Sequence, residues 1–254
     1  MPKLTFLGTG TSQGVPVIAC ECAICQSTNP LDKRLRTSAM IEMEEKTFVF
    51  DTGPDFRQQM LRANVKKLDA VLLTHLHKDH IAGLDDVRAF NYQTKAAMEV
   101  YADSITIDQL KKEYVYIFDG TDYPGIPKIN IHLIENKPFT IGNIPIIPIL
   151  VYHHKLPVFG FKIENIAYVT DANFIPHESK AHLYNLDVLV LNALRKTAHI
   201  SHFTLDEALE IIAELKPKRA YLTHISHWMG LHSEVSKELP DNVFLATDEL
   251  VVEV

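Results

Sequence analysis

The chain has 254 residues, of which 46% are hydrophobic and 22% are charged, and these values resemble those of ordinary globular proteins. They exclude disordered, collagen-like and low-complexity classes. The net charge of −7 disfavours nucleic acid as a partner, since bulk electrostatic binding needs the opposite sign. No apolar run approaches the roughly 18 residues of a membrane helix, and the N-terminus lacks a signal-peptide core, so we expect a cytoplasmic protein with no membrane partner.

Short apolar segments recur in both halves of the chain, and helical patterns interrupt them. The clearest helical pattern, Thr204–Lys216, begins at an N-cap threonine, has Glu207 at capping-box spacing and stops before Pro217. Other predicted helices lie near Pro54–Arg62 and at Ser104–Glu113. The predicted strands are, in chain order, Lys3–Gly8, Ser38–Glu42, Thr47–Phe50, Asp69–Thr74, Met98–Tyr101, Lys128–Ile134, Ile146–Val151, Val158–Ile163, Ala167–Thr170, Val188–Leu191, Ala220–Thr223 and Val243–Leu245.

The chain shows no internal division. No Gly/Ser-rich or charged linker separates two parts, and no repeat of roughly 20–50 residues is present. We therefore expect one domain over residues 1–254. Many strands with helices in each half predict an α/β sandwich, in which two sheets pack face to face and the helices lie outside.

Four of the predicted strands run into an acid or a histidine. They stop at Asp51, His75, Asp171 and His224. In α/β proteins, ligands and catalytic groups collect at the carboxyl ends of buried strands. A turn after a strand explains Asp51 and the Thr-Gly that follows it, but it does not explain two histidines in the same place. The pattern predicts one shared site.

The most informative stretch is Thr74–His80, which contains the pattern H-x-H-x-D-H in a chain of 13 His. At extended spacing, His75 and His77 project to the same side, so both can bind one ion. If the chain then turns into a helix, Asp79 and His80 point elsewhere and can serve a second ion nearby. Neutral imidazole is the commonest metal ligand. The stretch therefore predicts a metal site.

All three cysteines, Cys20, Cys22 and Cys25, lie within six residues of one another. In a reducing compartment such a cluster indicates metal binding or reactivity. Three thiolates favour a structural zinc ion, which needs a fourth ligand to complete a tetrahedron. Buried free thiols, a redox-active pair or a strained disulfide are the alternatives.

The H-x-H-x-D-H pattern after an apolar strand resembles the signature of the metallo-β-lactamase superfamily, and the resemblance extends along nearly the whole chain. It implies an αββα sandwich of two mixed β-sheets with a dinuclear metal site between them. His154 competes with His153 for one ligand position, and Asp51 is expected to orient a ligand histidine from behind. The resemblance implies that His75, His77 and His153 bind one ion, that Asp79, His80 and His224 bind the other, and that Asp171 bridges the two.

Further motifs are similar to those of the bacterial phosphoribosyl 1,2-cyclic phosphate phosphodiesterases of phosphonate breakdown. They are Phe6–Ser12, the cysteine cluster, Asp51-Thr-Gly and Leu222–His227. This resemblance assigns a structural Zn²⁺ to Cys20, Cys22, Cys25 and His227. Transfer-RNA 3′-processing nucleases share the H-x-H-x-D-H signature, but the chain has no basic insertion that could act as their RNA-gripping arm.

The expected reaction is the hydrolysis of a small cyclic or linear phosphodiester, with phosphoribosyl 1,2-cyclic phosphate as one candidate substrate. Two divalent ions, Zn²⁺ or Mn²⁺, bring four positive charges, and two carboxylates and a bridging hydroxide remove three, which favours an anionic substrate. Attack of the metal-bridging hydroxide on phosphorus would open the diester. The resemblance implies that Asp79 and His202 are catalytic, with His202 as general acid or phosphate contact and His199 as the alternative. The start of the predicted helix at Thr204 is expected to lower the pKa of His202.

Two other functions remain open. An acyl hydrolase acting on thioesters, lactones or lactams could use the same metal ligands, and a non-catalytic metal-binding carrier has a precedent in a cofactor-biosynthesis relative. A homodimer is expected from the family alone. Lys155, Arg195 and Lys196 are candidate phosphate contacts, whereas His132, His177, His182 and His232 are interpreted as surface or packing residues.

Overall fold

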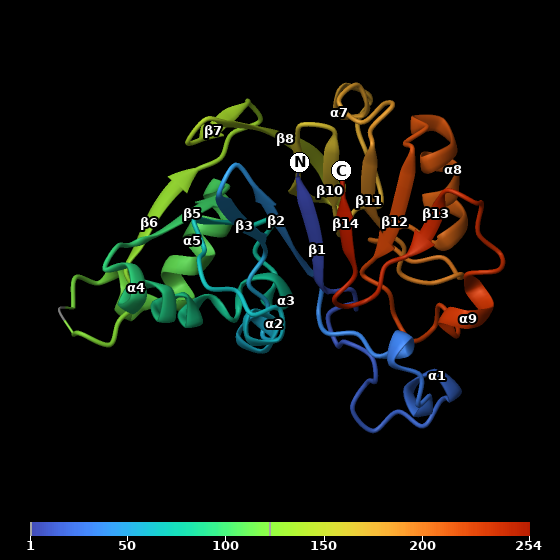
Figure 1. Ribbon diagram of the computed structural model, residues 1–254, viewed down its shortest axis with the longest axis horizontal. Helices are drawn as coiled ribbons and strands as arrows, with labels where there is room; N and C mark the ends of the chain where they lie inside the picture. The colour runs from blue at the N-terminus through green and yellow to red at the C-terminus, as the bar shows by residue number, and fades with distance from the viewer. Residues whose placement is uncertain (1, 122) are drawn as a thin grey trace.

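Two seven-stranded β-sheets form the centre of the molecule (Figure 1). The structure is a computed structural model that describes residues 2–121 and 123–254. The first sheet has the order β14 (Val251–Glu253), β1 (Lys3–Gly8), β2 (Ser38–Met43), β3 (Lys46–Phe50), β4 (Ala70–Leu72), β5 (Met98–Ala102) and β6 (Ile129–Leu133). The second has the order β13 (Val243–Leu245), β12 (Arg219–Thr223), β11 (Val188–Asn192), β10 (Ile166–Val169), β9 (Leu156–Ile163), β8 (Ile144–His153) and β7 (Phe139–Ile141).

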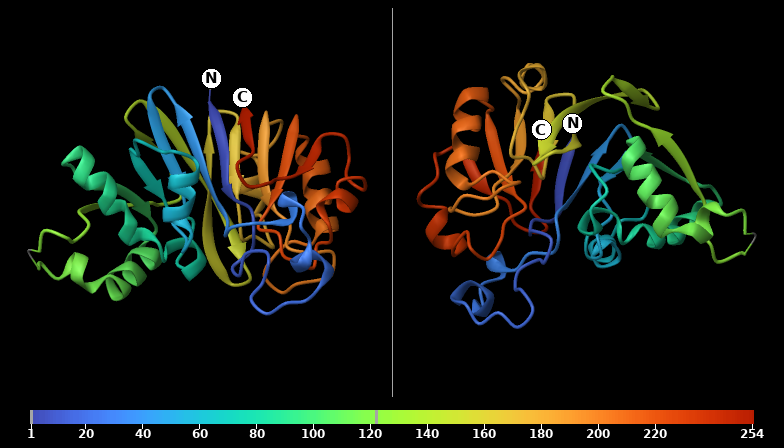
Figure 2. Two further views of the ribbon diagram at one scale, coloured as in Figure 1. Left: turned by 60° about the horizontal axis from the view of Figure 1, so that its bottom comes forward. Right: turned by 180° about the vertical axis from the view of Figure 1, so that it is seen from behind.

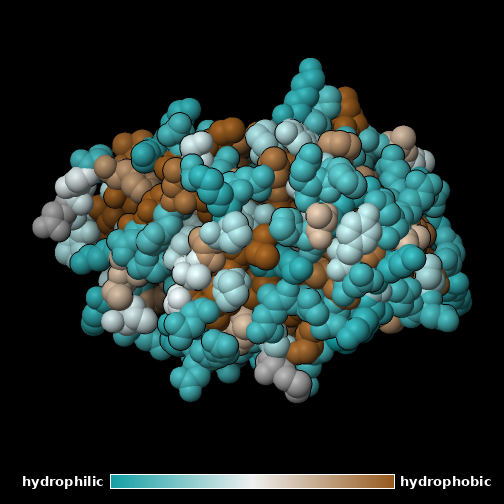
Figure 3. All heavy atoms as spheres, turned by 90° about the horizontal axis from the view of Figure 1, so that it is seen from above, coloured by the Kyte–Doolittle hydropathy of each residue, from teal (hydrophilic) through white to brown (hydrophobic). Residues whose placement is uncertain are grey.

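Both sheets are mixed. Strands β3 to β6 are parallel to one another, as are β10 to β13, while the remaining neighbours pair antiparallel. Because β14 pairs with β1, the two ends of the chain lie side by side (Figure 2). The end of the molecule where they lie is mostly hydrophilic, with apolar side chains gathered toward the left of Figure 3, the side of β6. In the described part of the chain, no helix combines the length and apolar character needed to cross a bilayer.

The hydrophobic core has three layers, as an αββα sandwich requires. One cluster of buried side chains fills the space between the sheets, and one lies on the outer face of each sheet. The helices α2 (Phe56–Arg62), α3 (Lys78–Ile81), α4 (Arg88–Thr94), α5 (Ser104–Glu113) and α6 (Val115–Phe118) follow strands of the first sheet, and α7 (His177–Lys180), α8 (Leu205–Leu215) and α9 (His232–Val235) lie beside the second. The short α1 (Ala23–Gln26) and single 3₁₀ turns at Pro30–Asp32 and Leu84–Val87 complete the elements. The predicted fold class is confirmed.

Helix α8 shows how the local sequence sets an element. The Thr204 hydroxyl accepts a hydrogen bond from the Glu207 N–H at 3.2 Å, and the Glu207 carboxylate accepts one from the Thr204 N–H at 2.8 Å. This reciprocal capping box satisfies two backbone donors at the helix start. The predicted α5 has the observed bounds, and α2 begins two residues later than predicted. The short strands β7 and β14 were not among the predicted strands, because each offers only three residues of pattern.

Phe50 lies in the hydrophobic layer between the two sheets, and its replacement tests how much that layer stabilises the fold. Its ring is fully buried and stacks on Tyr168 at 4.8 Å and on Phe161 at 5.7 Å between ring centroids. Phe50→Ala would leave a cavity between the sheets, so we expect a loss of about 3–5 kcal/mol in the free energy of unfolding, measured by urea denaturation. The control Phe174→Ala, at a ring 57% exposed, should cost about 1 kcal/mol or less. Equal losses in the two variants would contradict the assignment of Phe50 to the core.

Candidate metal centre

The expected site residues meet at one end of the sandwich. Asp51 directly follows β3, His75 follows β4 after two residues, and His153 is the last residue of β8. Asp171 follows β10 after one residue, and His224 directly follows β12. The site therefore draws on strands of both sheets, at the carboxyl ends of strands that run in the same direction, as the sequence pattern predicted.

Two groups of donor atoms lie close enough to hold cations. Within each group every donor atom is within 4.8 Å of the others. Asp171 belongs to both groups, so its carboxylate stands between them. The first group is His75, His77, His153 and Asp171, and the second is Asp79, His80, Asp171 and His224. These are the seven residues that the family resemblance implied, grouped in the same two sets.

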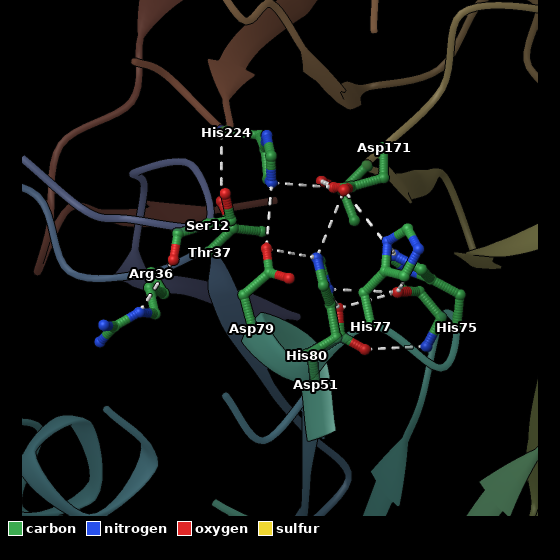
Figure 4. A network of polar contacts seen from close by, with 12 residues as sticks. Ser12, Arg36, Thr37, Asp51, His75, His77, Asp79, His80, Asp171 and His224 are labelled. Carbon is green, nitrogen blue, oxygen red and sulfur yellow. Dashed lines mark hydrogen bonds and ion pairs between the residues drawn. The ribbon is translucent and has the colours of Figure 1, made fainter. Parts of the chain in front are cut away.

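The donors of the second group point toward one another (Figure 4). His80 Nε2 lies 3.2 Å from Asp79 Oδ2 and 3.4 Å from Asp171 Oδ2. His224 Nε2 lies 3.2 Å from Asp171 Oδ1 and 3.5 Å from Asp79 Oδ2. Among the described residues neither Nε2 atom has a hydrogen-bond partner, although both are buried. Buried polar atoms are rarely left in this condition, and a cation bound among these four side chains would satisfy them.

The charges around His80 also favour a cation. Burial by itself disfavours the imidazolium, but the carboxylates of Asp171, Asp79 and Asp51 stabilise it more strongly, so the pKa of His80 is raised well above its ordinary value. The pKa of Asp171 lies well below its usual range in spite of burial, because His224 and His80 stabilise the carboxylate. The centre thus stabilises positive charge in a buried position, which is where a divalent metal ion would be held.

Polar groups behind the donors hold them in place. Asp51 is fully buried, accepts hydrogen bonds from the Thr74 N–H at 2.8 Å and hydroxyl at 2.9 Å, and lies 2.6 Å from His80 Nδ1. This contact directs His80 Nε2 toward the other donors, the role that was expected of Asp51. The Thr37 hydroxyl accepts from the His224 N–H at 3.2 Å.

Two further sets of hydrogen bonds that hold the site in place are not predicted by the sequence pattern. The Asn192 side chain bonds both the N–H and the C=O of Ala172 and so fixes the residue after Asp171. The carbonyl of Ser201 accepts from His153 Nδ1 at 2.8 Å. Asn192 could have been noticed, because it ends an apolar strand in the same way as the predicted ligands do, whereas a backbone carbonyl leaves no trace in the sequence.

The strand ends also have an unusual backbone. Asp51, Asp171 and His224 have φ angles of 64°, 55° and 56°, in the left-handed region. Such angles turn the chain sharply as it leaves the sheet, at a cost for residues other than glycine. Gly53 is required for a different reason, since a Cβ there would lie 2.1 Å from the Asp79 carbonyl oxygen. The Asp-Thr-Gly motif therefore lets the short helix α3, which contains Asp79, approach the first sheet closely.

His202 lies beside both donor groups. Its ring centroid is 4.5 Å from that of His153 and 4.8 Å from that of His224. Burial lowers the pKa of His202 to about 3, so its imidazole is neutral at pH 7 and has one N–H to donate. The dominant cause is burial and not the start of α8, which had been the expected cause. His199 lies farther out, 5.1 Å from His202 between ring centroids, and His154 is exposed on the β8–β9 turn.

The three cysteines surround one imidazole nitrogen. The Sγ atoms of Cys20, Cys22 and Cys25 lie 3.3, 3.4 and 3.4 Å from Nδ1 of His227. Tetrahedral zinc with bonds of about 2.3 Å to sulfur and 2.0–2.1 Å to nitrogen would separate these atoms by about 3.5 Å, so the four donors fit a zinc ion. The Cys25 N–H donates to Cys22 Sγ and lowers the pKa of Cys22 to about 6, while burial raises the pKa of Cys25 to about 11.

The candidate phosphate contacts and the remaining histidines differ in their surroundings. Lys155 is exposed on the β8–β9 turn, and Lys196 pairs with Glu238 at 2.6 Å. The guanidinium of Arg195 donates to two backbone carbonyls of its own loop. None of the histidines that were interpreted as surface or packing residues belongs to a donor group in the described chain; these are His132, His177, His182 and His232.

Comparison with known proteins gives the family. The profile of the Beta-lactamase superfamily domain matches residues 46–225. A solved structure described as a new diphosphatase from the PhnP family is 40% identical, covers 100% of this chain and 98% of its own, and superposes with a TM-score of 0.94. Curated relatives include an octanoyltransferase of Porphyromonas gingivalis, 37% identical over 98% of this chain and 51% of its own length. A ribonuclease Z of Methanococcus maripaludis is 27% identical over 53% of this chain and 39% of its own length.

The chain spans about half or less of the length of these two curated relatives. The profile match, in contrast, contains the H-x-H-x-D-H stretch, Asp171 and His224, and the PhnP-family structure aligns over the full chain. The fold, the donor groups and these matches agree. The chain therefore belongs to the metallo-β-lactamase superfamily and, within it, to the PhnP family of metal-dependent hydrolases.

Proposed function

We propose that this chain is a phosphodiesterase that uses two divalent metal ions, Zn²⁺ or Mn²⁺, to hydrolyse a small cyclic or linear phosphodiester. The observation that carries the proposal is the shared position of Asp171 between two groups of buried donors. Two adjacent cations suit phosphodiester cleavage, because they polarise phosphoryl oxygens, stabilise the charge that develops on them and lower the pKa of a water molecule. The diphosphatase named in the PhnP family supports a phosphorus-centred reaction.

The residues of the chain divide the work in this proposal. His75, His77 and His153 hold one ion, and Asp79, His80 and His224 hold the other. Asp171 contributes to both sites, and Asp51 keeps His80 oriented by the hydrogen bond to Nδ1. Asp79 has the most exposed side chain of the second group, so it also adds negative charge where it would help to place the nucleophile.

His202 is the proposed contact to the substrate. It is a neutral imidazole beside both donor groups, and its Nδ1 atom has no hydrogen-bond partner among the described residues. A ring nitrogen that carries a proton can donate to a phosphate oxygen or to the departing alkoxide. His202 thereby orients the diester and supplies a proton to the leaving group.

His202→Ala is expected to keep both ions and to lose most turnover. Removing a proton donor of this kind lowers kcat by about 10²- to 10⁴-fold, and the metal donors are untouched. Steady-state kinetics with bis-p-nitrophenyl phosphate and metal analysis of the purified variant measure the two effects. The exposed His182→Ala serves as control and should retain its rate. An unchanged rate in His202→Ala would remove His202 from the reaction.

The second ion site proposed here is structural. We infer that Cys20, Cys22, Cys25 and His227 bind one Zn²⁺, supported by the spacing of their donor atoms. This site joins α1 and the loop before it to the loop after β12, which lies more than 200 residues away in sequence. A closed set of four protein ligands leaves no position for substrate, so the ion serves the fold.

An acyl hydrolase is the second candidate, and one observation favours it: the octanoyltransferase that is 37% identical over nearly the whole chain. The chain spans only 51% of that protein, so its acyl transfer can reside in the part that has no counterpart here. Parallel assays with cyclic and linear phosphodiesters, an octanoyl thioester and a lactam, each with added Mn²⁺ or Zn²⁺, separate the candidates. Thioester turnover without diester cleavage would replace the proposed function with acyl hydrolysis.

A further inference from the structure

Trp228 is the only tryptophan of the chain, and its ring contacts two functional parts of the molecule. It stacks on His227, with 5.1 Å between ring centroids and 22° between ring planes. The guanidinium carbon of Arg195 lies over the same indole, 4.9 Å from the ring centroid. The indole is 62% exposed, so packing in the core does not account for its position. His227 belongs to the thiolate cluster formed with the three cysteines.

The N–H groups of the Arg195 guanidinium hold the loop that follows β11. Its Nε donates to the carbonyl of Thr197 at 3.1 Å, and Nη2 donates to the carbonyl of Ala198 at 2.7 Å. Residues 193–204 contain no helix or strand, and residues 196–198 are exposed, so few backbone contacts fix the outer part of this loop. The two carbonyl contacts of Arg195 are therefore among the few that order this part of the loop, together with the Lys196–Glu238 pair and a bond from Asn173 Nδ2 to the Ile200 carbonyl.

The same loop reaches the metal centre. Its Ser201 carbonyl accepts the hydrogen bond from His153 Nδ1, and His202 places its ring against His153 and His224. His199 Nδ1 lies 3.3 Å from the Ser201 nitrogen and braces the turn between them. A shift of the loop would move the His153 contact and the His202 ring together. Displacements of about 1 Å in such groups can cost about 10²-fold in rate.

We propose that Arg195 and Trp228 are positioning residues that connect the thiolate cluster to the loop 195–203 and so set the place of His202. Arginine suits this task because its planar guanidinium can stack on an indole while its N–H groups bond two carbonyls, and lysine cannot do both. Arg195 is then a brace of the loop and not a contact to phosphate. The consequence for turnover rests on the proposed function, whereas the consequence for loop order does not.

The experiment measures loop order and turnover in the same variants of the full-length, metal-loaded protein. Arg195→Ala removes both carbonyl contacts, and Arg195→Lys keeps the charge but can make at most one of them. Trp228→Leu removes the aromatic ring on which Arg195 and His227 lie, and Trp228→Phe keeps a smaller ring there. Arg88→Ala is the control, because Arg88 makes an ion pair with Asp85 at 3.1 Å on an exposed helix start. The readouts are hydrogen exchange of the amides in residues 197–203, emission of the single tryptophan, and kcat and KM separately.

We expect amide exchange in residues 197–203 to be about 10-fold faster in Arg195→Ala and Arg195→Lys, with a smaller increase in Trp228→Leu that Trp228→Phe reduces. The emission of Trp228 should change in both Arg195 variants, and kcat should fall about 10-fold or more while KM stays within about twofold. Arg88→Ala should match the parent in all readouts. Unchanged amide exchange in the Arg195 variants, or a rise in KM alone, would overturn the proposal that Arg195 positions the loop. Faster exchange in these variants, combined with no diesterase activity in the parent protein, would support the role of Arg195 in loop order and refute the proposed function.

Discussion

Asp171→Asn is expected to lower kcat by more than about 100-fold and to reduce the metal content of the purified protein. Groups that merely orient metal ligands cost about 10- to 100-fold when they are removed, and Asp171 is a donor in both groups. Asparagine keeps the shape of the side chain and tolerates the left-handed backbone with its φ of 55°. The loss therefore reports the missing charge and not a refolded loop.

The matched control for this variant is Asp187→Asn. Asp187 precedes β11 on the same sheet, and its carboxylate pairs with Lys218 at the surface. Its loss should leave kcat and metal content unchanged. Metal analysis and bis-p-nitrophenyl phosphate kinetics are done on both variants at saturating Mn²⁺ and Zn²⁺. Full activity in Asp171→Asn with two ions retained would show that the carboxylate does not join the two sites.

The position of Asp171 illustrates what the sequence could reveal about this site. Four strands that end on Asp or His predicted a shared site because parallel strands bring their carboxyl ends to one edge. That rule needs only the pattern of apolar residues, and the structure brings Asp51, His75, Asp171 and His224 together at one end of the sandwich. The assignment of His153 over its neighbour His154 rests on family resemblance, since the two residues are adjacent at the end of β8.

Supports made by the backbone were outside the reach of the sequence. The Ser201 carbonyl that receives His153 Nδ1 belongs to a loop without regular structure, and its course depends on Arg195 and Trp228, which come from different strand ends. The left-handed angle of His224 is equally hidden, because only a small fraction of histidines adopt it even though histidine is enriched there. Tertiary contacts decide such features, and a local pattern contains no information about them.

The thiolate cluster shows the same limit in another form. Cys20, Cys22 and Cys25 announce a metal site by spacing alone, but the fourth donor, His227, lies more than 200 residues away. The contact across that distance is accompanied by others between the same two regions. Arg34 donates to the Ala246 carbonyl at 2.5 Å, and Asp248 accepts from the Thr9 N–H at 2.9 Å. The N-terminal loops are thus attached to the C-terminal part by polar contacts as well as by the cluster.

Cys25→Ser is expected to release the structural zinc and to lower the melting temperature by about 4–12 °C. Structural zinc contributes apparent binding free energies of about 10–16 kcal/mol in zinc-finger peptides, and losing even a fifth of this is about 2–3 kcal/mol. In a protein of this size each 1 kcal/mol corresponds to about 2–4 °C. Cys25 is the buried member of the cluster, so its replacement also leaves a polar hydroxyl in place of a packed, less polar sulfur atom.

The contacts of Arg34 and Asp248 determine which part of the protein loosens when the zinc ion is lost. They survive in Cys25→Ser, so the sheets should stay assembled while the loop that carries Cys20 and Cys22 loosens. We expect one zinc fewer per chain, faster limited proteolysis within residues 17–27, and a fall in kcat below tenfold. The exposed Ile18→Ser in the same loop is the control and should keep its zinc and its melting temperature. If Cys25→Ser melts like the parent and retains its zinc, the cluster is not the tie between the two ends of the chain, and the thiols are merely neighbours of His227.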